Sequence, residues 1–167
     1  MTAPAARKVS DSQTVMTHRA LPEDANPAGN VHGGVILKHI DLAGAVCAMR
    51  HSRTSVVTAS IDRMEFKAPV QVGELMLLYA SVNRAGKQSM EIGVRVVVEN
   101  LMTGEQRHAA SAYLTFVAMG PDKKPALAPG LVLENPTHER RNREADMRRQ
   151  LRLEERQRER LAQESEK

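Results

Sequence analysis

The sequence of 167 residues has little aromatic content, one cysteine and no tryptophan. Aromatic residues make up only 2% of the chain, which leaves few rings to stack on nucleic-acid bases. Cys47 has no second cysteine with which to form an internal disulfide, in agreement with a reducing compartment. The chain lacks both an apolar run long enough to span a membrane and the apolar centre of a signal peptide. We therefore expect a soluble, cytoplasmic protein without a membrane partner.

Excess charge is also scarce, because the formal net charge is only +4. Residues 134–167 contain ten basic and nine acidic side chains, so this arginine-rich end is nearly neutral. The remaining surplus is too small for the basic surface that binds nucleic acid. We expect a solvated surface of mixed charge and no nucleic-acid partner.

The longest apolar segment covers residues 33–50 and exceeds the length of an ordinary strand. Small residues within it, including Ala43, Gly44 and Ala48, permit close packing against another element. The segment is apolar on nearly every side. It therefore predicts a long helix that the rest of the chain covers on most sides.

Residues 89–99 show the period-two alternation of a half-buried strand. Further strand-like segments with their hairpin turns are residues 10–20, 56–66, 74–85 and 107–119, with turns at 84–87 and 99–105. Short connections between successive strands favour antiparallel pairing. We expect an α+β fold in which an antiparallel sheet wraps the long central helix.

A stretch rich in proline and glycine, residues 120–130, marks the end of the globular part. We divide the chain into an N-terminal arm (1–9), a globular domain (10–125), a linker (126–133) and a charged helical tail (134–167). The tail has a thin apolar stripe and many opposite charges at helical spacing, which predicts a mostly solvated helix. A helix that binds a partner or caps an oligomer is the alternative.

Candidate chemistry gathers at the start of the predicted helix. Gly33 and Gly34 remove side chains where a ligand could approach the free backbone N–H groups, although glycines can also simply begin a helix. Asp41 follows two helical turns after Gly34 and lies on the same side. Its carboxylate is costly in an apolar segment unless it is hydrogen-bonded or functional, and it could act as a base. A pair with Lys38, or an exposed gap in the apolar run, is the alternative.

The turn before the helix contains Asn26, whose carboxamide offers both a donor and an acceptor to a water or a carbonyl group. Asn26 could equally be an ordinary turn or capping residue. Two histidines on the helix, His32 and His39, are too far apart to hold one metal ion between them. We expect no metal site.

Three stretches resemble the hotdog-fold acyl-CoA thioesterases, specifically the cytosolic (brain-type) acyl-CoA hydrolases and their bacterial relatives. They are PEDANPAGNVHGGVILKHIDLAGAVCA, VTASIDRMEFKAPVQVGE and GKQSMEI. The likeness extends over roughly residues 10–135, and the turn and helix around Asn26 and Asp41 are its most specific part. The resemblance implies a hotdog fold, with the helix as the sausage and the sheet as the bun. It also implies hydrolysis of fatty acyl-CoA to free CoA and a carboxylic acid.

The family likeness assigns Asp41 and Asn26 as the catalytic pair, which would meet from opposite subunits of a homodimer with shared active sites. Asp41 would activate water, with direct attack on the thioester as the alternative, and Asn26 would orient water or the thioester. His32, Gly33 and Gly34 would bind substrate, with the two glycine N–H groups stabilising the oxyanion. The likeness further implies a trimer of dimers and no cofactor beyond the CoA of the substrate.

Candidate CoA contacts come from the same likeness. The expected contacts are Val57, Thr58, Ala59 and Ser60 along the pantetheine, and Arg84, Lys87 and Ser89 near phosphate or ribose. A hairpin turn with solubilising charges is the alternative at the last three positions.

The sequence alone also allows other functions. Cys47 and His51 share a helical face and could form a thiolate–imidazole pair, although a cysteine in an apolar helix usually belongs to the core. The same fold also hosts enoyl-CoA hydratases or dehydratases, in which His32 or His39 would move a proton. A non-enzymatic acyl-CoA-binding or interaction module is a further possibility.

Overall fold

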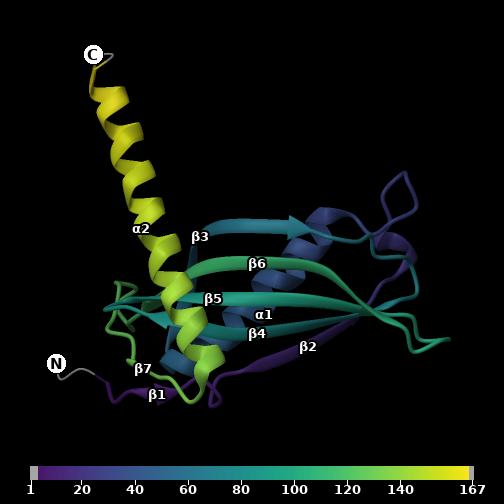
Figure 1. The fold of residues 1–167 in the computed structure, drawn as a ribbon, viewed down its shortest axis with the longest axis horizontal. Coiled ribbons are helices and arrows are strands. Elements are labelled where there is room, and N and C mark those ends of the chain that lie inside the picture. The colour runs from purple at the N-terminus through teal and green to yellow at the C-terminus, as the bar shows by residue number, and fades with distance from the viewer. Residues whose placement is uncertain (1–3, 166–167) are drawn as a thin grey trace.

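Helix α1 (Gly33–Ser52) lies along one face of a five-stranded antiparallel sheet in the computed structural model, which describes residues 4–165 (Figure 1). In spatial order the strands are β2 (Thr14–Arg19), β4 (Leu75–Ala85), β5 (Ser89–Glu99), β6 (Gln106–Met119) and β3 (Ser55–Phe66). The predicted α+β arrangement, with a long helix and an antiparallel sheet, is confirmed. Because β2 and β3 are the outer strands, each has one side without a strand neighbour in the described chain.

Small residues let α1 pack closely on the sheet. A side chain added at Gly44 would come within 2.9 Å of the fully buried ring of Phe116, so only glycine fits there. Ile36, Ile40 and Cys47 are buried on the same face of the helix. The helix ends at Arg53, which adopts a left-handed conformation with φ of 59° and donates its N–H to Met49.

The alternating strand patterns divide the sheet into two faces. In β5, Met90, Ile92, Val94, Val96 and Val98 point toward α1 and are buried, as the period-two pattern predicts. The expected hairpin turns join β4 to β5 and β5 to β6. Strand β3 has two register irregularities against β6, between Thr58 and Ser60 and between Ile61 and Arg63, which re-aim its side chains.

The N-terminal arm and the linker form a structure that the sequence did not predict. Strand β1 (Arg7–Lys8) pairs in parallel with β7 (Leu131–Val132), and Arg7 N–H donates to Gly130 O at 2.9 Å. The segment between β6 and the tail also contributes the buried Ala128 to the core. The boundaries expected at residues 9 and 125 therefore separate parts that pack together. A two-residue strand has no detectable period, which explains why it escaped prediction.

The charged tail forms helix α2 (Pro136–Ser165), which crosses the face of the sheet opposite α1 and extends beyond β3 (Figure 1). Most of its residues are exposed, as expected, but one side of its first half contacts the sheet. Its ion pairs reach across the sheet and join Asp146 to Arg84, Arg148 to Glu91, and Arg152 to Asp62. The helix packs on the sheet because its charged side chains form ion pairs with side chains of opposite charge on the outer face of the sheet. Among the described residues, neither helix is long and apolar enough to cross a membrane.

Candidate active site

Asp41 faces the outer strand β3 from the side of α1. Thr58 Oγ1 donates a hydrogen bond to Asp41 Oδ1 at 2.7 Å, and Asp41 is half-buried rather than sunk in the core. The described residues contain no ion pair between Asp41 and Lys38, the alternative that helical spacing suggested. The carboxylate is therefore held by a neutral donor, which orients it without neutralising its charge.

Asn26 lies in a closed turn between the short helix η1 (Pro22–Asp24) and α1. Its Oδ1 accepts hydrogen bonds from the N–H groups of Ala28 at 2.9 Å and Asn30 at 3.3 Å. Its backbone N–H donates to Asn30 O at 2.7 Å, and Gly29 supplies the positive φ of 83° that this tight turn needs. Two donors on Oδ1 fix the orientation of the carboxamide. The NH2 group of Asn26 is thus the part that can donate to a ligand.

The start of α1 shows which backbone N–H groups are free. His32 is the N-cap, and its Nδ1 accepts from the N–H of Gly34 at 3.1 Å, so this N–H is already occupied. The expected pair of oxyanion donors is corrected accordingly, because only Gly33 N–H lacks a partner among the described residues. Acceptance at Nδ1 places the proton of a neutral His32 on Nε2, where it can also donate.

A cavity of about 360 Å³ opens beside Gly33 at the start of α1. Most of its lining residues are apolar; the lining consists of Val31, Gly33, Ile36, Phe66, Lys67, Ala68, Pro69 and Val70. The ring of Phe66 lies so near Gly33 that an added side chain would come within 3.1 Å of it. Gly33 therefore allows an aromatic ring, or a ligand in its place, to approach the helix N-terminus closely.

The two expected catalytic residues do not meet within one chain. Asp41 lies about 12 Å along α1 from its first residue, given the rise per residue of a helix. No hydrogen bond joins Asn26 to Asp41 in the described part of the chain. One subunit thus holds both residues but does not by itself assemble them into one site.

The candidate CoA contacts divide into two groups. Val117 of β6 pairs with Val57 of β3 on one side and with Ser89 of β5 on the other. The start of β3 and the hairpin between β4 and β5 therefore lie at the same end of the sheet. Lys87 is exposed in that hairpin. Arg84, by contrast, is bound to Asp146 on the outer face. The structure thus offers Lys87 and Ser89 to a ligand, while Arg84 already has a structural partner.

Residues 57–60 also take different positions. Thr58 binds Asp41, and Ser60 Oγ donates to Asp62 Oδ1 at 2.7 Å on the other face of the sheet. Val57 and Ala59 are exposed on the outer strand. The register irregularity at Ala59 turns Thr58 and Ser60 to opposite faces. The role of Thr58 as the partner of Asp41 was missed, since no local sequence signal links two residues 17 positions apart.

The thiolate–imidazole alternative does not fit the structure. Cys47 is fully buried, and burial raises the pKa of its thiol to about 12. His51 is also fully buried, with its Nε2 at 3.1 Å from Pro129 O, and burial lowers the pKa of its imidazole. A neutral, enclosed thiol is a core residue rather than a nucleophile. No cluster of three potential metal ligands occurs within the described residues.

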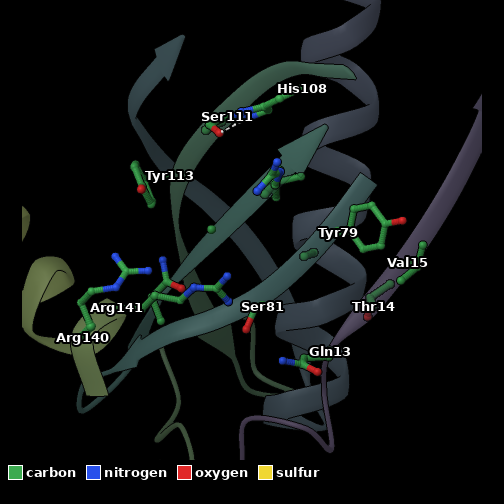
Figure 2. Close-up of a pocket in the computed structure, with 16 residues that line it drawn as sticks. Gln13, Thr14, Val15, Tyr79, Ser81, His108, Ser111, Tyr113, Arg140 and Arg141 are labelled. Atoms are coloured by element: carbon green, nitrogen blue, oxygen red, sulfur yellow. Dashed lines mark hydrogen bonds between the residues drawn. The ribbon is translucent and has the colours of Figure 1, made fainter. Parts of the chain in front are cut away.

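A second cavity, of about 450 Å³, lies on the outer face of the sheet beside α2. Figure 2 shows Tyr79 and Val15 toward one end and Arg140 and Arg141 toward the other, with Ser111 hydrogen-bonded to His108. Asp41 is on the opposite face of the sheet, on α1. This cavity is therefore separate from the candidate active site.

The comparisons with known proteins agree with this geometry. A model of the thioesterase superfamily matches residues 28–105. YkhA of Bacillus subtilis, named as an uncharacterized acyl-CoA thioester hydrolase, is 38% identical over 134 residues. That match covers 80% of this chain and 78% of YkhA.

Two solved structures share the fold over nearly the whole chain. A hexameric acyl-CoA thioesterase in its apo form has a TM-score of 0.88 at 36% identity, covering 91% of this chain and 97% of its own. The acyl-CoA hydrolase of Staphylococcus aureus, in complex with butyryl-CoA, CoA and CoA disulfide, has a TM-score of 0.87 at 30% identity. That match covers 95% of this chain and 97% of the relative.

Alanine variants of the S. aureus hydrolase have also been solved. They replace an asparagine, an aspartate and a threonine whose spacing equals that of Asn26, Asp41 and Thr58 here. The fold, the family model and the sequence identity all agree. This chain therefore belongs to the thioesterase superfamily, among the acyl-CoA thioester hydrolases with the hotdog fold.

Proposed function

We propose that this enzyme hydrolyses the thioester of fatty acyl-CoA, with Asp41 of one subunit and Asn26 of its partner at each site. The observation that carries the proposal is the Asp41 carboxylate, which Thr58 holds through one oxygen beside the open outer strand. The second oxygen remains available to a water molecule. A carboxylate oriented in this way is suited to act as a general base.

In the proposed reaction Asp41 takes a proton from water as the hydroxide oxygen forms a bond to the thioester carbonyl carbon. The carbonyl oxygen becomes an oxyanion, which Gly33 N–H at the helix N-terminus and the NH2 group of Asn26 stabilise, both from the subunit opposite the one that supplies Asp41. The carbon–sulfur bond then breaks, and the CoA thiolate receives the proton from Asp41. The products are a carboxylic acid and free CoA, and no metal or redox cofactor takes part.

A shared site requires a homodimer, and the outer strand β3 is the surface we propose for it. A strand with unpaired backbone groups readily pairs with a second copy. Leu42, Val46 and Met49 form an exposed apolar stripe along α1 next to Asp41, which also favours a subunit contact. The hexameric relative supports further assembly of three dimers.

The substrate assignment is supported by shape and chemistry. The apolar cavity beside Gly33 suits an acyl or pantetheine segment, because it lies next to the free N–H that would receive the oxyanion. In this proposal Lys87 and Ser89 contact the nucleotide part of CoA; their position at the end of the sheet where β3 begins supports this. We propose a cytoplasmic location, in agreement with a single cysteine, Cys47, which cannot form a disulfide within the chain.

A panel of acyl-CoA substrates from acetyl- to palmitoyl-CoA, with free thiol as the readout, tests the proposal. Wild-type protein should release thiol, and Asp41→Asn should lower kcat by about 10²- to 10⁴-fold while the oligomer and its melting temperature are retained. Near-normal turnover in that variant would contradict the mechanism. Measuring hydration of enoyl-CoA in parallel separates hydrolysis from the hydratase alternative.

A further inference from the structure

We propose that His18, Asp24 and His39 are positioning residues that hold the Asn26 turn in its reactive geometry, and that protonation of His39 loosens it. The three residues lie on β2, η1 and α1, on the side of α1 that faces the outer strand β2. None belongs to the candidate catalytic set. The inference rests on the proposed function of Asn26 and adds a pH-dependent support for it.

Asp24 connects three elements just before the turn. Its Oδ2 accepts hydrogen bonds from the backbone N–H of Leu21 and from His18 Nε2, each at 2.9 Å. Its backbone carbonyl accepts from the N–H of His32, the N-cap of α1, at 2.8 Å. Asp24 therefore ties β2 to the base of the turn and the base of the turn to the helix.

The Asn26 turn is anchored at both ends by these contacts. Asp24 precedes Asn26 by two residues, and His32 follows the bridge between Ala25 and Val31 that closes the turn. The hydrogen bonds on Asn26 Oδ1 come from within the turn itself, so they fix its internal shape. The placement of the turn on the fold depends on Asp24 at its start, and at its end on Asn30 and Val31, which bond to Gln71 and Val70. A shift of Asp24 therefore pivots the turn about its far end and displaces the NH2 group of Asn26.

His39 holds His18 in the position that reaches Asp24. The two imidazole rings are stacked, with centroids 3.9 Å apart and an angle of 25° between their planes. His18 is thus clamped between the ring of His39 and the carboxylate of Asp24. Two neutral rings, or one neutral and one charged ring, can stack in this way. Two imidazolium ions at this distance repel each other.

The charges around the cluster favour a neutral His39. Burial is the main cause that lowers its pKa, followed by His18 on β2, while Asp24 on η1 acts in the opposite sense and Lys38 on its own helix lowers it further. The pKa of Asp24 is lowered by the Leu21 N–H and by His18, so its carboxylate stays ionised. A histidine whose pKa is lowered by folding stabilises the folded geometry most when it is neutral, above about pH 6.5. This stabilisation is lost as the pH falls below that value and the ring becomes protonated.

The first test compares pH profiles of acyl-CoA hydrolysis. At pH 8 Asp24→Asn should lower kcat by about tenfold with little change in KM, because the turn is displaced rather than the substrate pocket. For each protein the activity at about pH 5.5 is divided by its activity at pH 8. This ratio should be at least threefold higher for His39→Gln than for wild type. His108→Gln, which changes a histidine on the opposite face, should follow the wild-type profile. An unchanged acid limb in His39→Gln, or wild-type kcat in Asp24→Asn, would overturn the proposal.

A conservative substitution tests the contact itself. His18→Gln retains a side-chain N–H for Asp24 and should keep more activity than His18→Ala. Adding Asp24→Asn to His18→Ala should cost little more, because both changes break the same link. Equal losses in His18→Gln and His18→Ala, or additive losses in the double variant, would argue against the link.

A spectroscopic test needs no variant that could misfold. In the wild-type oligomer, the side-chain NH2 resonances of Asn26 should shift along the titration curve of His39 as the pH falls below about 6.5. Resonances that stay constant while His39 titrates would contradict the coupling. If wild type released no thiol from any acyl-CoA, the proposed function would fail, whereas this titration would still decide the positioning inference.

Discussion

At the scale of single residues, Asp41 differs from most carboxylates of this chain because its partner is a hydroxyl group. Glu74 and Glu91 are bound by Arg107 and Arg148, whereas within residues 4–165 Asp41 accepts only the Thr58 hydroxyl. An arginine partner would stabilise the ionised carboxylate and make it a poorer base. A hydroxyl orients one oxygen and leaves the charge available for water. This contrast supports a catalytic rather than a structural role for Asp41.

The Thr58 hydroxyl can be tested by its removal. Thr58→Ala should lower kcat by about tenfold with little change in KM, the effect of one lost hydrogen bond to a charged group. Thr58→Ser keeps the hydroxyl and should retain most of the activity. Steady-state kinetics with one acyl-CoA decide the matter. Equal activity in Thr58→Ala and wild type would show that Asp41 needs no such support.

Local motifs predicted the candidate residues but not their contacts. Asn26, Gly33 and Asp41 fall within one continuous stretch, so helical spacing and family likeness place them correctly on a turn, a helix start and a helix. The occupation of Gly34 N–H by His32 depends on one side-chain rotamer, which spacing does not reveal. The stacking of His18 on His39 joins two elements and was equally invisible.

At the scale of elements, helix α2 docks through charge rather than through an apolar face. Glu91 is 5% exposed, and Arg148 binds it while also lying over the ring of Tyr113, 3.7 Å from the ring centroid. A buried carboxylate is stable only while its partner remains. The contact between Arg148 and Glu91 therefore anchors α2 on the sheet.

Replacing Arg148 by alanine should expose this dependence. Arg148→Ala leaves Glu91 buried without its cation, and we expect a loss of about 3 kcal/mol in the free energy of unfolding. Arg149→Ala, an exposed neighbour on the same helix, should change it by less than about 0.5 kcal/mol. Urea denaturation measures both. Similar stability in the two variants would mean that the contact contributes little.

Elements were predicted correctly where a periodic pattern extends over many residues. Contacts between residues far apart in the sequence were not predicted. Helix α1 and strand β5 carry sustained patterns, so the fold class followed from them. The docking of α2 depends on ion pairs between residues 57 and 90 positions apart, which no local pattern contains. The thin apolar stripe of the tail therefore predicted its exposure but not the ion pairs of its first half.

At the scale of the whole molecule, the proposed active site needs a second copy of the chain. Strand β3 has an open side, α1 presents an exposed apolar stripe, and Asn26 lies apart from Asp41. A second copy that pairs at β3 would cover these surfaces and could bring its Asn26 turn to Asp41. No local sequence pattern shows which surface binds a second subunit. The shared site was therefore predicted only from the resemblance to a known family.

Mixed oligomers test the shared site most directly. Asn26→Ala and Asp41→Ala subunits should each be inactive alone, but a mixed dimer should have one site with both residues intact and one with neither. Refolding equal amounts together should therefore restore about one quarter of wild-type thiol release from acyl-CoA, if subunits pair at random. Activity that stays at the level of the two separate variants, although mixed dimers have formed, would contradict a site built from two subunits.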